Sequence, residues 1–249
     1  MIVYPNAKIN IGLNVLEKRA DGYHELSSVF YPVKDLYDIL EIIPSGKFCF
    51  SSSGIEIPGE GNICTKAFKM LKQDFGISNV KIHLHKKIPI GAGLGGGSSD
   101  GAFILKALNE LFDLKMSNTQ LEKYALRLGA DCPFFIENTP KYVTGIGEEM
   151  KNIDLELSDY EIKFIFPELH ISTAEAYGSI TPKIPKTNLL DLINQPIENW
   201  RGKVKNDFEI SVFIMNPQLE KMKKQLYADG AIYASMTGSG SVLYGVMRK

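Results

Sequence analysis

Cysteine is scarce in this sequence, and its three copies form no recognisable pattern. Cys49, Cys64 and Cys132 are odd in number and lack the short spacings of metal ligands. This excludes a disulfide-stapled scaffold and a cysteine-ligated metal site. Unpaired thiols of this kind are typical of reduced proteins in a cytosol, and we expect a cytoplasmic location.

Long apolar runs and a charge imbalance are also missing. No stretch approaches the roughly 18 apolar residues that a membrane-spanning helix needs. The first residues lack the basic-then-apolar order of a signal peptide. The formal net charge is −1, with no basic excess and no block of like charges. The sequence therefore predicts neither a membrane nor a nucleic acid as a partner.

The composition that remains is that of a globular protein. The chain has 249 residues, 44% of them hydrophobic, which is enough for one large domain or two smaller ones. Residues 144–147, Thr-Gly-Ile-Gly, predict a hinge, and a second composition begins at Tyr160. Strand and helix patterns occur on both sides of this point, so we expect a two-domain α+β protein.

Five glycines lie within residues 88–100, Ile-Pro-Ile-Gly-Ala-Gly-Leu-Gly-Gly-Gly-Ser-Ser-Asp. This stretch joins a predicted strand at 80–84 to a predicted helix at 102–111, with Ser98, Ser99 and Asp100 as candidate N-caps. Glycines allow a backbone to approach a phosphate closely, and the start of a helix favours anions. The stretch therefore predicts a cradle for a triphosphate.

Three other interpretations of the glycine stretch are weaker. A flexible linker would not usually open directly into a capped amphipathic helix. Gly91, Gly93 and Gly96 satisfy the dinucleotide fingerprint, but the acid about 20 residues on would have to be Asp113, at the end of a helix rather than of a strand. A Walker loop is excluded because no Gly-Lys-Ser/Thr follows.

Residues 7–16 alternate cleanly between apolar and polar positions, which predicts a half-buried strand. Lys8 and Asn10 then project from the same face, one pleat apart. From the pattern alone, Lys8 is as consistent with a solvated strand lysine as with a functional one.

Other local signals predict further strands and helices, but they do not decide the roles of Asp131 and of the Tyr23-His24 pair. Strands are expected at 29–31 and 36–43, ended by Pro32 and Pro44, and a loop at 51–61. Asn62 is expected to cap a helix through Leu71, and Gly76 to end it. Asp131 follows a helix stop and precedes an apolar segment, which suits a cap or a functional carboxylate equally. The Tyr23-His24 pair suits an ordinary strand.

Several motifs occur in one order along the whole chain: Pro-Asn-Ala-Lys-Ile-Asn, Arg-Ala-Asp-Gly-Tyr-His, the glycine stretch, Leu-Gly-Ala-Asp-Cys-Pro-Phe, Asn-Asp-Phe-Glu and Met-Thr-Gly-Ser-Gly-Ser. Together they resemble the GHMP kinase superfamily, and most of all those members that phosphorylate 4-diphosphocytidyl-2-C-methyl-D-erythritol. Two departures are Ala92, where glycine is usual, and Gly101, where alanine is usual.

The resemblance implies a two-domain GHMP kinase fold. Its N-terminal part, residues 1–147, would be a ribosomal-S5-like ATP-binding domain, and its C-terminal part, residues 148–249, a ferredoxin-like domain. It also implies that the glycine-serine tip at 237–241, which by pattern suits a plain hairpin, braces the first glycine stretch.

The resemblance further implies roles for individual residues. Lys8 and Asp131 would be catalytic, with Asp131 taking the hydroxyl proton and Lys8 steadying the developing charge. Substrate would be bound by Asn10, Tyr23, His24, Thr173 and Tyr177, with the cytosine between the two tyrosine rings. ATP would be bound by Pro89, Ile90, Gly91, Ala92, Gly93, Leu94, Gly95, Gly96, Gly97, Ser98 and Ser99, with Asn62 and Lys86 close to the nucleotide.

The implied reaction is transfer of a phosphoryl group from ATP to the 2-hydroxyl of that acceptor, a step of non-mevalonate isoprenoid precursor biosynthesis. Magnesium is expected with the ATP phosphates, but no dedicated protein metal site is expected; Ser98 is one candidate ligand. The rival interpretations are a superfamily kinase acting on homoserine or mevalonate, and a non-catalytic ATP-binding module. We expect a monomer or a weak homodimer.

Overall fold

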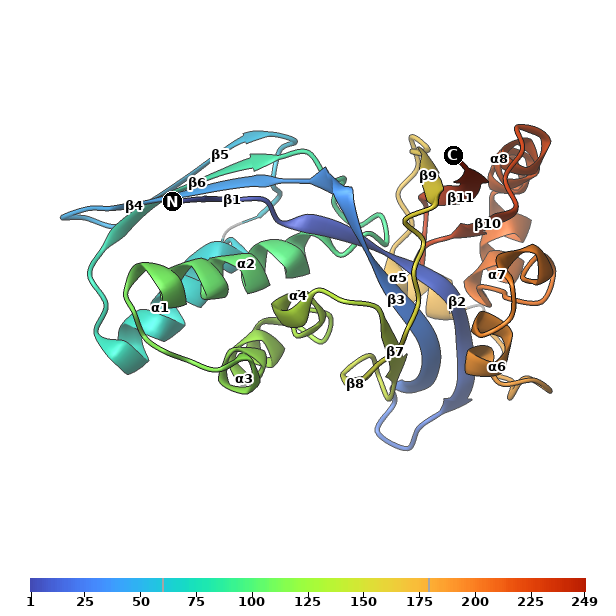
Figure 1. Cartoon of the computed structure of the whole chain (residues 1–249), viewed down its shortest axis with the longest axis horizontal. Helices are drawn as coiled ribbons and strands as arrows, with labels where there is room; N and C mark the ends of the chain where they lie inside the picture. Colours follow the sequence, from blue (N-terminus) through green and yellow to red (C-terminus); the bar gives the residue numbers. More distant parts are fainter. Residues whose placement is uncertain (60, 179) are drawn as a thin grey trace. The chain divides into compact units, whose positions relative to one another are not determined.

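A computed structural model describes residues 1–59, 61–178 and 180–249 (Figure 1). The chain divides into two compact units that are interleaved along the sequence. The first unit comprises Met1–Lys8, Pro32–Ile90 and Gly95–Thr139, and the second comprises Ile9–Tyr31, Gly91–Leu94 and Pro140–Lys249. The predicted division at residue 147 remains a prediction.

The first unit contains a four-stranded sheet in the order β1-β4-β6-β5, with helices on one face (Figure 1). Strand β5 runs parallel to β6, and the other neighbours are antiparallel. The strands are β1 (Ile2–Val3), β4 (Ile39–Pro44), β5 (Cys49–Gly54) and β6 (Val80–Lys86), and the helices are α1 (Ile63–Phe75), α2 (Gly96–Leu111), α3 (Asn118–Leu128) and α4 (Phe134–Glu137).

Local sequence signals explain how α1 and α2 are bounded and why they pack closely. Asn62 caps α1 by accepting a hydrogen bond from the Cys64 amide, and Gly76 ends it with a φ of 66°, as predicted. Gly101 lies where α1 crosses α2, and a Cβ there would come within 2.8 Å of the Ile63 side chain. Glycine at this position, a departure from the family pattern, thus fits the close approach of the two helices.

The second unit contains two sheets, one in the order β2-β3-β7-β8 and one in the order β10-β11-β9. Strands β2 and β3 contribute residues to both units. The strands are β2 (Asn6–Lys18), β3 (His24–Tyr37), β7 (Lys141–Thr144), β8 (Glu149–Asn152), β9 (Tyr160–Ile165), β10 (Tyr233–Met236) and β11 (Leu243–Arg248). The helices are α5 (Thr173–Gly178), α6 (Leu189–Ile193), the 3-10 turn η1 (Ile197–Asn199), α7 (Phe208–Met215) and α8 (Pro217–Ala228).

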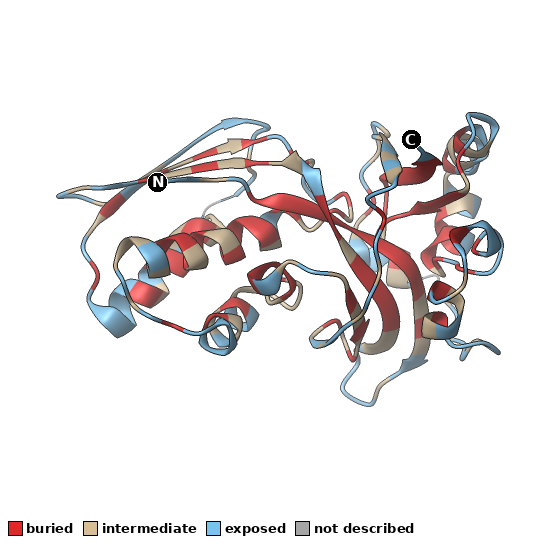
Figure 2. Cartoon of the chain, viewed as in Figure 1, coloured by how far each residue is buried: buried red, intermediate tan, exposed pale blue. Residues whose placement is uncertain are grey.

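The core of the second unit joins β2 to α7, α8 and the β10-β11 pair. Leu13 and Val15 of β2 belong to the same buried cluster as Phe208, Leu219 and Leu243. Figure 2 shows buried residues along almost the whole of β2 and β11. None of the described helices is long and apolar enough to cross a membrane.

Three local predictions need correction. Strand β2 is buried on both faces, not one, because Lys8 and Asn10 are covered as fully as the apolar residues between them. Pro32 does not end a strand, since β3 continues through it to Tyr37. Residues 51–54 of the predicted loop at 51–61 belong to strand β5, because pairing with β6 overrides their weak local preference.

Candidate active site

The glycine stretch forms a tight loop that leads into α2. Gly91, Gly93 and Gly95 have φ values of 67°, 78° and 67°, a region that residues with a side chain rarely adopt. Helix α2 starts at Gly96 with Gly95 as its N-cap. The predicted N-caps, Ser98, Ser99 and Asp100, were wrong, because these residues already lie within the helix.

The start of α2 has the properties of an anion site. The Ser99 amide donates to the Gly95 carbonyl at 2.9 Å, which begins the helical ladder. The amides of Gly96, Gly97 and Ser98 come before that bond, and in helix geometry they have no intrahelical acceptor. These amides and the positive end of the helix dipole favour a phosphate.

The first half of the glycine loop is held by the backbone of the second glycine-serine motif. A Cβ on Gly93 would lie 2.1 Å from the Thr237 carbonyl oxygen, so only glycine fits there. The Thr237 hydroxyl donates to the Gly93 carbonyl at 2.9 Å. The family resemblance implied this brace, and the contacts are present within the second unit.

Asn206 in turn fixes the motif that holds Gly93. Its side-chain amide donates to the carbonyls of Met236 and Gly238, at 2.8 Å each, and the residue is fully buried. Asn206 is the first residue of the Asn-Asp-Phe-Glu motif. In the sequence analysis this motif contributed to the family resemblance but predicted no structural role for Asn206. Its structural role depends on residues 30 positions away, so no local pattern could have revealed it.

Lys8 and Asp131 are brought together within the first unit. The Lys8 ammonium lies 3.7 Å from the Asp131 carboxylate, and the side chains are 4% and 34% exposed, so only the carboxylate is open to an incoming group. Burial lowers the pKa of the Lys8 ammonium, and the Asp131 charge opposes that shift. A Cβ on Gly95 would lie 3.0 Å from Lys8 Cγ, so the start of α2 rests directly on this lysine.

Lys86 is part of a buried ionic triad that includes Asp38, a residue that no sequence signal identified. Its ammonium lies 2.5 Å from an Asp38 oxygen and 2.8 Å from an Asp100 oxygen. The other Asp38 oxygen accepts the amides of Lys87 and Ile88, at 2.6 and 2.9 Å. The triad therefore joins the entry of the glycine loop to helix α2 that follows it. The predicted contact of Lys86 with the nucleotide remains a prediction.

The charges of the triad shape its titration. Burial raises the pKa of the Asp100 carboxyl to about 7, and the Lys86 ammonium partly opposes this. Burial also disfavours the charge on Lys86, but the two carboxylates outweigh it and raise the pKa of that lysine. Among the described residues, Asp100 Oδ1 and Ser99 Oγ are buried without a hydrogen-bond partner. The first turns of α2 thus contain polar atoms that are incompletely satisfied.

Two of the predicted substrate residues of the second unit, His24 and Tyr177, lie together. The rings of His24 and Tyr177 stack with centroids 4.8 Å apart, and Tyr177 also meets Phe208 edge-on. Tyr23 is 60% exposed. The hydroxyls of Thr173 and Ser239 lie 3.4 Å apart. His24 and Tyr177, 153 positions apart in the sequence, therefore share one corner.

Asn10 is buried in a hydrogen-bond network. Its side chain donates to the Ser28 hydroxyl at 2.9 Å, and its backbone amide donates to the Thr237 hydroxyl at 3.1 Å. The Tyr244 hydroxyl donates to its carbonyl at 2.8 Å. These bonds connect β2 to the motif that holds Gly93, and the predicted substrate bond of Asn10 remains a prediction.

Two further residues near the loop have definite chemical character. His170, which the sequence did not single out, packs so close to Gly91 that a Cβ there would lie 2.7 Å from its ring. Burial raises the pKa of the Cys132 thiol to about 12, so this neighbour of Asp131 is not a nucleophile at neutral pH. The described residues contain no group of three histidine, cysteine or acidic side chains able to hold a metal ion.

Comparison with known proteins identifies one family. Residues 62–138 match the GHMP kinases N terminal domain, and residues 186–249 match the GHMP kinases C terminal domain. The chain is 47% identical over 251 residues to a 4-diphosphocytidyl-2-C-methyl-D-erythritol kinase of Parabacteroides distasonis, covering 100% of this chain and 92% of that protein. It is 49% identical over 252 residues to the protein of the same name from Bacteroides thetaiotaomicron, covering 99% and 92%.

A solved structure extends the comparison to the fold. The crystal structure of a 4-(cytidine 5'-diphospho)-2C-methyl-D-erythritol kinase superposes with a TM-score of 0.86 at 32% identity, covering 99% of this chain and 90% of that one. The GHMP kinase fold predicted from the motifs is thereby confirmed. The chain belongs to the GHMP kinase family.

Proposed function

We propose that this protein transfers a phosphoryl group from ATP to the 2-hydroxyl of 4-diphosphocytidyl-2-C-methyl-D-erythritol. The observation that carries the proposal is the Lys8–Asp131 pair, 3.7 Å apart, with Lys8 packed against Gly95, the N-cap of α2. Two relatives named 4-diphosphocytidyl-2-C-methyl-D-erythritol kinase support this acceptor, because they are 47% and 49% identical to this protein across nearly the whole chain. The reaction belongs to non-mevalonate isoprenoid precursor biosynthesis.

The glycine loop would hold the ATP phosphates. Residues 89–99 supply glycine backbone and helix-start amides, and Asn62 and Lys86 would lie near the nucleotide. Phosphoryl transfer depends mainly on positioning and on neutralising charge, both of which such a cradle provides. Thr237 and the Asp38–Lys86–Asp100 triad would fix the loop before ATP binds, because they contact it or its two ends.

Asp131 would act as the general base. Its exposed carboxylate would accept the proton of the acceptor hydroxyl as that oxygen bonds to the γ-phosphorus. The bond from the γ-phosphorus to the β,γ-bridging oxygen would break, and ADP would leave with that electron pair. The buried Lys8 ammonium would stabilise both the Asp131 anion and the charge on the attacking oxygen.

The aromatic corner would recognise the cytosine. Tyr23 and Tyr177 would stack on its two faces, and His24 would form hydrogen bonds to its edge once it leaves the Tyr177 ring. Thr173 and Asn10 would form polar contacts with the rest of the acceptor. A homoserine or mevalonate kinase would have no use for such a corner, and this favours the cytidine-containing acceptor.

The remaining assignments follow from the chemistry. Mg²⁺ would arrive with the ATP phosphates, because the described residues offer no carboxylate cage, and Ser98 is the one side chain we assign to it. We propose a cytoplasmic location, supported by three free cysteines, and a monomer or weak homodimer.

The proposal is tested by ADP formation with a panel of acceptors. Purified protein, ATP and Mg²⁺ should form ADP rapidly with 4-diphosphocytidyl-2-C-methyl-D-erythritol and only at background rate with homoserine or mevalonate. Free 2-C-methyl-D-erythritol is the matched control, since it has the hydroxyl but lacks the cytidine. Equal activity with homoserine or mevalonate would contradict the assignment, and ATP binding without turnover on any acceptor would favour a non-catalytic module.

A further inference from the structure

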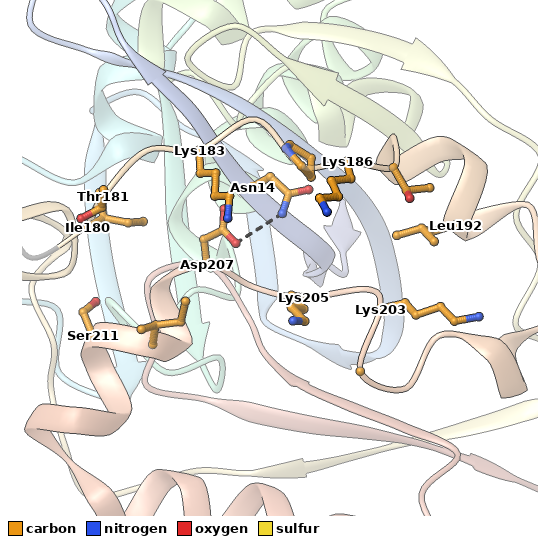
Figure 3. Close-up of a pocket in the computed structure, with 14 residues that line it drawn as sticks. Asn14, Ile180, Thr181, Lys183, Lys186, Leu192, Lys203, Lys205, Asp207 and Ser211 are labelled. Atoms are coloured by element: carbon orange, nitrogen blue, oxygen red, sulfur yellow. Dashed lines mark hydrogen bonds between the residues drawn. The ribbon is translucent and has the colours of Figure 1, made fainter.

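A lysine-lined hollow of about 560 Å³ lies in the second unit, between β2 and the segments that follow α5 and η1. None of the residues assigned above to ATP or acceptor binding lines it. Figure 3 shows Lys183, Lys186 and Lys205 placed around Asn14 and Asp207, with Lys203 pointing away from this group. Its volume falls within the usual range of small-molecule sites, about 300–1,000 Å³.

Backbone hydrogen bonds along β2 frame the hollow. The Lys183 amide donates to the Val15 carbonyl at 2.9 Å, which fixes one wall. The Leu13 amide donates to the Lys205 carbonyl at 2.9 Å, and the Asp207 amide donates to the Leu13 carbonyl at 2.8 Å, which fixes the other. The two walls are therefore attached to a strand that is buried along most of its length.

The charge of the hollow is unbalanced. Four lysines line it, and among the described residues none of the four forms a salt bridge. Asp207 is the single acid of the lining, and its oxygens accept the Val15 amide at 2.9 Å and the Asn14 side chain at 3.4 Å. Asp207 is thus occupied with holding β2, and Lys183, Lys186 and Lys205, the three lysines placed around it (Figure 3), leave an excess of two positive charges.

Apolar side chains also line the hollow, and Ile180 and Leu192 lie on opposite sides of the lysine group (Figure 3). Ile180, Pro185, Leu192 and Ile210 contribute to the lining, and the Ile210 side chain is 70% exposed. An exposed isoleucine beside unbalanced ammonium groups suits a ligand with two dissimilar ends. The apolar end would cover the isoleucine, and the anionic end would meet the lysines.

We propose that this hollow binds an organic diphosphate, with the diphosphate between Lys183, Lys186 and Lys205 and the apolar group against Ile210. A diphosphate fits better than a single phosphate because its two phosphoryl groups, with about three negative charges at neutral pH, would contact three separate ammonium groups. This site is additional to the proposed ATP and acceptor sites, so its occupation does not depend on the kinase assignment.

The hollow also adjoins the residue that fixes the second glycine-serine motif. Lys205 and Asp207 line the hollow, while Asn206 between them holds the carbonyls of Met236 and Gly238. A ligand in the hollow would therefore perturb the backbone amides of 205–207, which gives binding a local spectroscopic signature.

The test is calorimetric titration of the full chain with hexyl diphosphate, and separately with inorganic diphosphate. Both are carried out at a saturating concentration of a non-hydrolysable ATP analogue, so that the glycine loop is already occupied. The double variant Lys183→Glu/Lys205→Glu should bind hexyl diphosphate at least about tenfold more weakly, because two attractive charges become repulsive. Lys183→Arg/Lys205→Arg should retain binding.

The matched control is Lys151→Glu/Lys163→Glu, which reverses two exposed charges of the same unit outside the hollow. It should bind as the wild type does, and hexyl diphosphate should shift the amide resonances of 205–207. The proposal is overturned if wild-type protein shows no binding up to about 1 mM. It is equally overturned if both charge-reversed variants lose affinity alike, or if inorganic diphosphate binds as tightly as hexyl diphosphate.

Discussion

Replacing Lys86 with methionine would leave two buried carboxylates without the ammonium that joins them. Asp38 and Asp100 lie 2.5 and 2.8 Å from that ammonium, and all three residues are no more than 3% exposed. Methionine occupies much of the space of the aliphatic part of the lysine side chain, so the loss of stability is mainly electrostatic. Removing one partner of a buried ion pair typically costs about 3–5 kcal/mol. We expect the free energy of unfolding to fall by that amount.

The assay is urea denaturation of wild type and variant at pH 7.5, with Lys87→Met as the matched control. Lys87 is the next residue, but its side chain is exposed and its ammonium lies 5.2 Å from the centre of the Tyr37 ring. An exposed contact of this kind contributes about 0.5–1 kcal/mol, so the control should change little. Equal unfolding free energies for Lys86→Met and Lys87→Met would refute the argument that the triad holds the loop.

The triad also predicts how stability changes with pH. Burial raises the pKa of Asp100 from 3.8 to about 7 in the folded protein, so between these values the folded state binds more protons than the unfolded state. The contribution of Asp100 to stability is therefore present below pH 3.8 and is lost as the pH rises towards about 7. Lys86 opposes this shift, so Lys86→Met should extend the loss to higher pH. Parallel stability profiles for the two proteins above pH 7 would contradict this.

Two further substitutions test the loop and the aromatic corner. Gly93→Val should weaken binding of a non-hydrolysable ATP analogue in calorimetric titration, because its Cβ would meet the Thr237 carbonyl at 2.1 Å and its φ is 78°; unchanged affinity would place the phosphates elsewhere. Tyr177→Ala should raise the KM for the cytidine-containing acceptor roughly 5- to 150-fold, since stacking contributes about 1–3 kcal/mol per base, and should leave the KM for ATP unchanged. A lower melting temperature with both constants unchanged would instead assign Tyr177 to packing against Phe208.

Local signals predicted the elements whose cause is local. Helix α1 begins after Asn62 and ends at Gly76 because an amide cap and a left-handed glycine suffice to bound it. Strand β5 was missed because its stability comes from pairing with β6, about 30 positions further along the chain. The predicted strand end at Pro32 was wrong for the same reason. Strand β3 continues through this residue because pairing and burial outweigh the missing backbone N–H of proline.

The residues of the candidate site also fall into two groups: those that the local sequence identified and those that only the fold brings together. The glycine loop was recognisable because positive φ and close backbone approach require glycine itself, as at Gly93 and Gly95. The pairing of Lys8 with Asp131 came from the family resemblance, because 123 positions separate them. Asp38 lies inside the strand predicted at 36–43 and carried no distinguishing pattern, and only the folded chain brings it to Lys86.

The most direct test of the central claim is the turnover of four proteins on 4-diphosphocytidyl-2-C-methyl-D-erythritol and ATP: wild type, Lys8→Met, Asp131→Asn and the double variant. If Asp131 takes the proton and Lys8 supports it, each single variant should lose about 10²- to 10⁴-fold in kcat with ATP affinity nearly unchanged. The double variant should be little slower than the worse single one, because the two residues act as one unit. Wild-type turnover in either correctly folded single variant would contradict the account.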